Sequence, residues 1–320
     1  MMAILALNLK RKMCSFELFR RPVRWPVHGP GLPGTVRLAC GFWLAAMMAA
    51  MMAGAPAHGH GQAAAGSTAA GDAREGGGPV IVAHRGAMSE RPENTMAAFG
   101  RAVELGAGVV EVDVRSTRDG RLVVLHDATV DRTTDGHGRV SELELADVRA
   151  LDAGSWFDEA FAGERVPTLE QVLRWGAGRV DVLLDLKQSD PRFVAAVVAA
   201  VEAHGDRDRV IVGVRSPEQA REFRRRLPDC RQLAFMASAE LIEAFDQAGC
   251  DVLRLWLRWL EEDDQPLRRV RATGRKLMIN GTVGGLDEAR ALLGHRPEWI
   301  LIDDVQQLRE SLARLAGEAP

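Results

Sequence analysis

From Pro79 onward, short runs of aliphatic and β-branched residues alternate with longer stretches whose apolar residues recur every three or four positions. The short runs are typical of strands, and the longer stretches are typical of amphipathic helices. Eight such units in about 240 residues predict an α/β fold with parallel strands, a (β/α)8 TIM barrel. A doubly wound sheet is the alternative, but the Gly-rich phosphate loop that would favour it does not follow the first run. We expect strands at residues 80–84, 109–114, 180–186, 209–214, 231–235, 251–257, 276–280 and 298–302, and helices at residues 94–105, 168–176, 190–204, 216–227, 238–248, 262–273 and 286–293.

One segment interrupts this alternation directly after the second expected strand. Residues 121–125 (RLVVL) have the pattern of a strand, but only residues 118–120 (RDG) separate them from the strand before. An Asp-Gly pair between apolar runs predicts a two-residue type I′ hairpin, in which paired positions have numbers that sum to 239. Asp113 would then lie opposite His126, which would return to the rim of the barrel beside it.

The N-terminal region has the layout of an export signal. Residues 38–55 form an apolar run without charges, preceded by seven Lys and Arg residues and followed by Ala-x-Ala cleavage sites. We predict a signal peptide at residues 1–57, a flexible linker at residues 58–78 and the barrel domain at residues 79–320. An uncleaved anchor helix is the alternative, because the apolar run has a borderline length for a membrane span. The expected location is therefore periplasmic or extracellular, with no stable membrane insertion after signal cleavage.

The composition is that of a globular protein, with 27% charged residues, 47% hydrophobic residues and a formal net charge of -3. Removal of the signal would take seven basic residues and one Glu, so the net charge would change from -3 to -9. An acidic surface argues against a nucleic-acid partner. The sequence gives no indication of the oligomeric state. Cys230 and Cys250 precede adjacent expected strands, and both a disulfide between them and two buried free thiols are compatible with export.

Polar residues gather at the expected carboxyl ends of the first three barrel strands, where TIM-barrel active sites lie. Glu111 and Asp113 alternate along the second strand and therefore share a face, and Asp185 lies on the third strand. Three carboxylates that converge inside a barrel repel one another unless a cation joins them. Oxygen ligands favour a hard cation, so these residues predict a site for one divalent cation, Mg²⁺ or Ca²⁺.

Four further residues at the same strand ends suit phosphodiester chemistry. His84 and His126 are candidates for general acid and general base. Arg85 and Lys187 are candidates for binding a phosphate, the first through a forked contact and the second as a point charge. Taken singly, each residue also suits a structural role, such as a buried histidine or a solvated charge at a strand end. Together with a metal ion they fit cleavage of a phosphodiester.

From about residue 79 to residue 313, the chain resembles the glycerophosphodiester phosphodiesterase family. Several motifs in one order are far more specific than any single motif. The family fold is a (β/α)8 barrel, which agrees with the strand count above. The resemblance also implies that residues 127–166, after the second strand and its hairpin, form a small insertion that caps the barrel mouth. The resemblance rests on AHRG (83–86), PENT (92–95), EVDV (111–114), T-x-DG (117–120), HD (126–127), DRTTDG (131–136), PTLEQVL (167–173) and LDLK (184–187).

The resemblance implies a role for each matched residue and a glycerophosphodiester substrate that is hydrolysed to glycerol 3-phosphate and an alcohol. It implies that Glu93 lies near the metal, either as a ligand or behind one. Asn94 is followed by a helical stretch, and we expect it to be the N-cap of that helix. The implied metal ligands, acid–base pair and phosphate-binding residues are, in that order, Glu111, Asp113 and Asp185, then His84 and His126, then Arg85 and Lys187.

The sequence also departs from the family pattern. Asp185 stands where the family usually has Glu, and an Asp followed by Lys two residues later resembles the sphingomyelinase D and lysophospholipase D barrels. The seventh strand lacks the usual Trp-Thr pair, and Trp256 and Trp259 are candidates for the missing aromatic contact. Asp303 is the nearest equivalent of the usual Thr-Asp end of the last strand. Three functions stay open: a glycerophosphodiester hydrolase, a phospholipase D-like enzyme, and a non-catalytic barrel that binds phosphodiesters.

Overall fold

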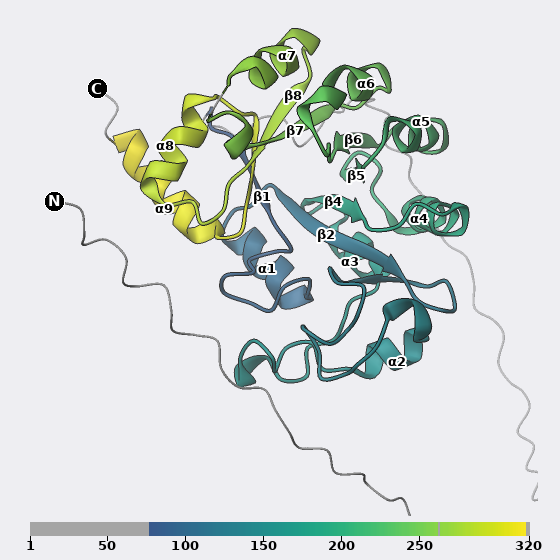
Figure 1. The fold of residues 1–320 in the computed structure, drawn as a ribbon. Coiled ribbons are helices and arrows are strands. Elements are labelled where there is room, and N and C mark those ends of the chain that lie inside the picture. The colour runs from purple at the N-terminus through teal and green to yellow at the C-terminus, as the bar shows by residue number, and fades with distance from the viewer. Residues whose placement is uncertain (1–76, 262, 318–320) are drawn as a thin grey trace, which may run out of the picture. The chain divides into compact units, whose positions relative to one another are not determined.

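The computed structural model describes residues 77–261 and 263–317, which contain a closed barrel of parallel strands surrounded by helices (Figure 1). The predicted signal peptide and most of the predicted linker lie outside the described residues. The barrel strands follow the order β1-β9-β8-β7-β6-β5-β4-β2, and pairing of β1 with β2 closes the ring. The TIM-barrel prediction is confirmed and the doubly wound alternative is wrong. The strands are β1 (Val80–Ala83), β2 (Val109–Ser116), β4 (Asp181–Leu186), β5 (Val210–Val214), β6 (Arg231–Ala234), β7 (Val252–Trp256), β8 (Lys276–Asn280) and β9 (Trp299–Ile302).

The helices begin at residues whose chemistry fits a helix start. The Thr168 hydroxyl accepts from the Gln171 N–H and completes a capping box, and Pro191 and Pro217 occupy first-turn positions. Ser238 precedes only a short 3₁₀ turn, and its side chain makes no capping bond. The last helix was not predicted. The α-helices are α1 (Met96–Glu104), α2 (Leu145–Ala150), α3 (Leu169–Gly176), α4 (Pro191–His204), α5 (Pro217–Arg226), α6 (Ile242–Gln247), α7 (Gln265–Thr273), α8 (Leu286–Gly294) and α9 (Val305–Gly317).

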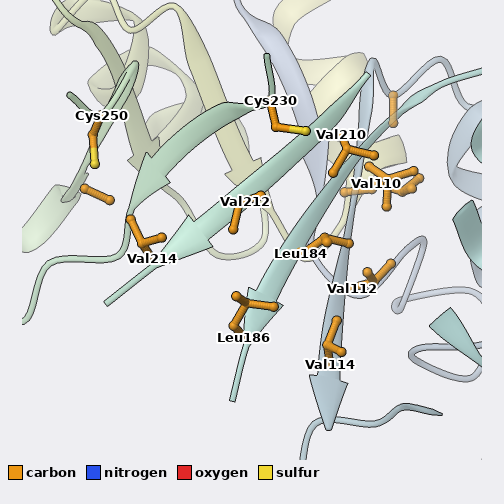
Figure 2. Packing of buried hydrophobic residues seen from close by; sticks show 14 of the residues in the cluster. Val110, Val112, Val114, Leu184, Leu186, Val210, Val212, Val214, Cys230 and Cys250 are labelled. Carbon is orange, nitrogen blue, oxygen red and sulfur yellow. The ribbon is translucent and has the colours of Figure 1, made fainter. Parts of the chain in front are cut away.

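Two separate groups of buried apolar side chains follow from the alternation along each strand. One group faces the helices, and Figure 2 shows its members on β2, β4 and β5, such as Val112, Leu184 and Val212. The other group fills the barrel interior and includes Leu183, Leu233 and Phe235. The barrel interior is therefore filled with apolar side chains, and the polar side chains at the carboxyl ends of the strands lie above this core.

The hairpin after the second barrel strand differs from its prediction by one residue of register. Strand β3 (Leu122–Val124) pairs with β2 so that Val114 faces Val124, and paired numbers sum to 238 rather than 239. The Thr117 hydroxyl accepts from the Arg121 N–H and donates to Asp119, which closes a three-residue loop. Because Gly120 has a φ of +75°, the loop takes the three-residue form with a left-handed glycine. The expected pairing of Asp113 with His126 is wrong, and Leu125 donates to the Asp113 carbonyl instead.

The insertion after β3 has a small apolar core of its own, to which β3 contributes. Trp156 is 39% exposed and meets Phe157 edge to face, and Phe157 meets Phe161 in the same way. The Trp156 indole N–H donates to the Ala153 carbonyl within the insertion. The core of the insertion comprises Val123, Leu125, Val130, Val140, Val148, Ala153 and Val166.

Cys230 and Cys250 are buried free thiols, so a disulfide between them is excluded in this structure (Figure 2). The β6–β7 register pairs Leu233 with Val252, which continues back to place Cys250 beside Arg231 rather than beside Cys230. Burial raises the pKa of Cys230 to about 11 and that of Cys250 to about 12, which keeps both thiols protonated. Within the described residues, no helix combines the length and the apolarity needed to cross a membrane.

Candidate active site

Three buried carboxylates converge at the carboxyl ends of two neighbouring strands. Glu111 and Asp113 lie on β2 and Asp185 lies on β4, where the register pairs Asp113 with Asp185. Each of the three offers an oxygen within 4.8 Å of the others, and all three are buried. The structure thus brings together the residues that the sequence predicts as one cluster.

The electrostatics of this cluster favour a cation. Burial, followed by the charges of Asp113 and Asp185, raises the pKa of Glu111 well above its usual value. Glu111 accepts a backbone N–H bond from Arg85 at 2.9 Å, but no side-chain cation contacts it among the described residues. Burial opposes ionisation of Asp113 as well, yet the charges of Lys187 and His126 lower its pKa. A donor set made only of carboxylate oxygens, one of them without a cationic partner, fits Mg²⁺ or Ca²⁺.

Basic side chains border the other two carboxylates. The Lys187 ammonium lies 2.7 Å from Asp113 Oδ1 and 2.5 Å from Asp185 Oδ2. Arg215 follows β5, and its Nη2 donates to both oxygens of Asp185 at 2.5 and 2.7 Å. Arg85 Nε lies 3.4 Å from Asp113 Oδ2. Arg85 and Lys187 therefore lie at the cluster as expected, whereas Arg215 was missed because no motif includes it.

The turn after β1 holds Arg85 in an uncommon backbone conformation. Arg85 has a φ of +56° and Gly86 a φ of +84°. A Cβ at Gly86 would lie 2.7 Å from the carbonyl carbon of Ala98, so only glycine fits against α1. This turn points the Arg85 N–H at Glu111 and its guanidinium at Glu93, 3.0 Å away.

Asn94 is not the N-cap of α1, contrary to expectation. The Thr95 hydroxyl accepts from Ala98 and caps the helix. Asn94 lies one residue earlier, with a φ of +58°, and its amide donates to Asp113 Oδ2 at 2.7 Å. Its Oδ1 accepts from the Asp113 N–H at 3.2 Å. Asn94 therefore binds both the carboxylate and the backbone N–H of Asp113, a contact between distant segments that helix-start patterns do not reveal.

Glu93 connects the barrel with the insertion. It is buried, and its carboxylate accepts from Arg85 and from two nitrogens of Arg132 at 2.7 and 2.8 Å. Burial opposes its ionisation, but the Arg132 hydrogen bonds and the nearby Arg85 charge lower its pKa. Among the described residues, Arg85 connects Glu93 with the cluster, because its guanidinium contacts both Glu93 and Asp113. Arg132, which also binds Asp127 at 2.7 Å, was not singled out from the sequence, although it lies within the DRTTDG motif.

Two histidines flank the cluster, and each is held by a carboxylate. His84 Nδ1 lies 2.6 Å from Asp303 Oδ1, and His126 Nδ1 lies 2.8 Å from Asp127 Oδ1. Such contacts fix the ring orientation and place the proton on Nδ1, which leaves Nε2 to exchange a proton with a substrate. Burial lowers the pKa of His126. Asp303 directly follows β9, and its contact with His84 was not predicted from the sequence.

Comparison with known proteins decides the family. The profile of the Glycerophosphoryl diester phosphodiesterase family matches residues 84–304, from the first candidate histidine to the residue after Asp303. The chain belongs to this family. Members of the glycerophosphodiester phosphodiesterase family are phosphoric diester hydrolases, and the cluster described above lies within the matched region.

Several relatives carry the same family name. A glycerophosphodiester phosphodiesterase of Caldanaerobacter subterraneus subsp. tengcongensis is 38% identical over 174 residues, which are 53% of this chain and 71% of the relative. A glycerophosphodiester phosphodiesterase of Bacillus subtilis is also 38% identical, over 135 residues that span 39% of this chain and 46% of the relative.

Solved structures agree with these sequence relatives. The crystal structure of a glycerophosphodiester phosphodiesterase from Agrobacterium tumefaciens has a TM-score of 0.64 at 30% identity, covering 72% of this chain and 99% of that one. An Oleispira antarctica phosphodiesterase, solved in complex with the product sn-glycerol-3-phosphate, has a TM-score of 0.67 at 25% identity, covering 73% and 97%.

Proposed function

We propose that this chain is an exported, metal-dependent glycerophosphodiester phosphodiesterase that releases glycerol 3-phosphate and an alcohol. One observation carries the proposal: a buried three-carboxylate cluster is flanked by two carboxylate-held histidines at the mouth of a TIM barrel. The family match supports the reaction class, and the product bound by the Oleispira relative supports glycerol 3-phosphate.

The carboxylates and the basic residues of the site would have different roles in phosphodiester cleavage. Glu111, Asp113 and Asp185 would hold the divalent cation, which when bound supplies positive charge to the phosphate oxygens. Arg85 and Lys187 border the same space and would bind the remaining phosphate oxygens. Both are held in place by carboxylates, so their charges are oriented before substrate binds.

The two histidines would move the protons. Because burial lowers the pKa of His126, its ring is neutral at neutral pH and can accept a proton from the attacking hydroxyl at Nε2. His84, held by Asp303, would donate a proton to the leaving alcohol oxygen. Asp127 and Asp303 would stabilise the protonated ring of their partner at the stage when each carries a positive charge.

The surface of the barrel argues against a lipid substrate. Among the described residues, only Trp156 and Val283 are large apolar side chains that are exposed. A phospholipase D-like enzyme needs an apolar channel or patch for an acyl chain, and two separate side chains do not form one. We therefore favour water-soluble glycerophosphodiesters over lysophospholipids or sphingolipids.

Product analysis tests this proposal. Purified protein would be incubated with glycerophosphocholine or glycerophosphoglycerol and Mg²⁺ or Ca²⁺, with and without excess chelator, and glycerol 3-phosphate would be quantified. We expect its release only without chelator. Release of phosphocholine instead of choline, or equal activity in excess chelator, would contradict the proposal. Mass determination of the exported protein tests export, with an expected N-terminus after Ala55 or Ala57.

A further inference from the structure

A second polar group at the barrel mouth has no part in the proposed chemistry. Arg254 lies on β7, two residues after Val252, whose side chain belongs to the interior cluster, so Arg254 also points into the barrel. The Arg254 side chain is buried, and its residue is only 5% exposed. Its Nη2 donates to the Met236 carbonyl at 3.3 Å, whereas Nε and Nη1 have no partner among the described residues.

Aromatic rings contact the Arg254 guanidinium but do not accept hydrogen bonds from its free N–H groups. The Arg254 guanidinium carbon lies 4.4 Å from the Trp256 ring centroid and 5.6 Å from that of Phe235. The Phe235 ring lies against Gly213 of the neighbouring strand β5, where a Cβ would be 2.4 Å from the ring and only glycine leaves room for it. Ring faces attract a cation but accept no N–H bond of ordinary strength.

An unpaired buried guanidinium is costly, because its donors have lost water without gaining partners. Burial and the nearby Arg215 charge lower the pKa of Arg254 to about 10, so it still carries its charge at neutral pH. No carboxylate contacts it among the described residues, since the nearest cluster member, Asp185, is bound by Arg215 and Lys187. Arg254 is therefore a preformed donor for an anion that comes from outside.

A neighbouring strand offers a matching acceptor. Asn280 ends β8, and the register places it beside Trp256 on the same side of the barrel wall. Its Oδ1 is buried and has no hydrogen-bond partner among the described residues. Two donors on Arg254 and one acceptor on Asn280 thus have no hydrogen-bond partner among the described residues. Their strands, β7 and β8, lie across the ring from β2 and β4, which carry the carboxylate cluster.

We infer that Arg254 and Asn280 form a subsite for an anionic group on the alcohol part of the substrate. The inference rests on the proposed function, because the phosphate to be cleaved must occupy the carboxylate cluster. Arg254 donates to a phosphate or carboxylate oxygen of the alcohol, and Asn280 accepts from a hydroxyl beside that oxygen. The preferred substrates are glycerophosphodiesters whose alcohol carries a second negative charge, and a cationic alcohol such as choline is disfavoured by the same guanidinium.

Binding and turnover test this subsite separately. Calorimetric titration would use the His84→Ala background, with bis(glycerophospho)glycerol, glycerophosphoserine and glycerophosphocholine as ligands. We expect both anionic ligands to bind more tightly than the choline compound, and Arg254→Met to reduce this preference by roughly tenfold to 100-fold, as loss of charge-assisted hydrogen bonds does. In otherwise native protein, the ratio of kcat/KM values should change in the same direction. Tighter binding of bis(glycerophospho)glycerol alone would show that the subsite recognises a phosphate, and tighter binding of glycerophosphoserine alone would show that it recognises a carboxylate.

Two matched variants complete the test. Arg254→Lys keeps the charge and should retain part of the preference, whereas Arg258→Met removes an exposed guanidinium from the same Trp256 ring and should retain all of it. Arg254→Met removes an unpaired buried charge, so its melting temperature should not fall. An equal loss for every ligand, or no preference in the parent protein, would overturn the subsite. Failure to hydrolyse any of the compounds would contradict only the proposed function, because the binding preference is measured without turnover.

Discussion

The barrel buries carboxylates at both ends, and the two ends compensate them differently. At the amino end of β4, Asp181 is contacted by Arg209 at 3.2 Å and by Arg231 at 2.7 Å. At the carboxyl end, Glu111 lies within 4.8 Å of two other acids and receives one backbone N–H bond. Asp181 is thus paired with two guanidinium groups, whereas Glu111 has no side-chain cation in contact within residues 77–261 and 263–317.

This difference indicates which end of the barrel can bind a cation from solution. Asp181 and its arginines form a closed group, and Arg231 also covers the Trp299 ring, 5.8 Å from its centroid. In the carboxylate cluster, Lys187 and Arg215 contact Asp185, but in the part of the chain that the structure describes no side-chain cation contacts Glu111. Three acids in this arrangement repel one another, and a divalent cation bound between them would offset that repulsion.

The largest expected effect concerns the two histidines at the carboxyl end. His84→Ala and His126→Ala should each lower kcat by roughly two to four orders of magnitude, the range for general acid–base groups. Neither residue lies in the apolar core, so the melting temperature should change little. Steady-state assays on glycerophosphoglycerol, together with thermal denaturation, measure both. Near-normal turnover in either variant would remove that histidine from the mechanism.

The amino end should respond in the opposite way. Asp181→Asn leaves two guanidinium groups without their carboxylate and should lower the free energy of unfolding by about 1–3 kcal/mol. Its kcat should stay within about twofold of the parent value, because the change lies at the far end of the barrel. Urea denaturation and the same assay check the pair of outcomes. A large loss of kcat in the folded variant would show that the two ends are coupled.

A smaller and opposite stability effect is expected at Glu111. Its raised pKa means that the metal-free protein loses stability as pH rises above the unfolded value near 4.3 and through the folded pKa. Glu111→Gln removes this loss, so the metal-free variant should be more stable by about 1 kcal/mol at neutral pH, or about 2–4 °C in Tm. The gain should shrink near pH 4. Thermal melts in excess chelator at both pH values test this, and a lower Tm for the variant would argue against repulsion within the cluster.

The finest test is the pH dependence of turnover. If His126 is the general base, activity requires its neutral form and falls as the ring is protonated. Because burial lowers the pKa of His126, the acidic limb of kcat/KM should have its midpoint below the ordinary histidine value of about 6.5. A midpoint above that value would assign the limb to another group.

The sequence predicted the barrel well because its strands are continuous apolar runs, and every expected barrel strand is present within two residues of its predicted ends. It also placed Glu111, Asp113 and Asp185 together, since alternation along a strand fixes which side chains share a face. The hairpin register was wrong because the Thr117 hydroxyl, rather than the Asp-Gly pair alone, closes the loop. The register of a hairpin depends on such local hydrogen bonds.

The supporting contacts were missed for a different reason. Asn94 with Asp113, Arg132 with Glu93 and Asp303 with His84 all join residues that are at least 19 positions apart. No period or spacing encodes which of many arginines or acids meets a given partner across the barrel. Only the closed fold brings these groups together.

Metal binding tests the central claim most directly. Isothermal titration of metal-free protein with Mg²⁺ and with Ca²⁺ would compare the parent chain, Glu111→Gln and the matched control Asp181→Asn. We predict one cation per chain for the parent and for Asp181→Asn, with an affinity at least about tenfold weaker for Glu111→Gln because one carboxylate ligand is lost. Equal affinities for all three proteins, or no binding to the parent, would contradict the account.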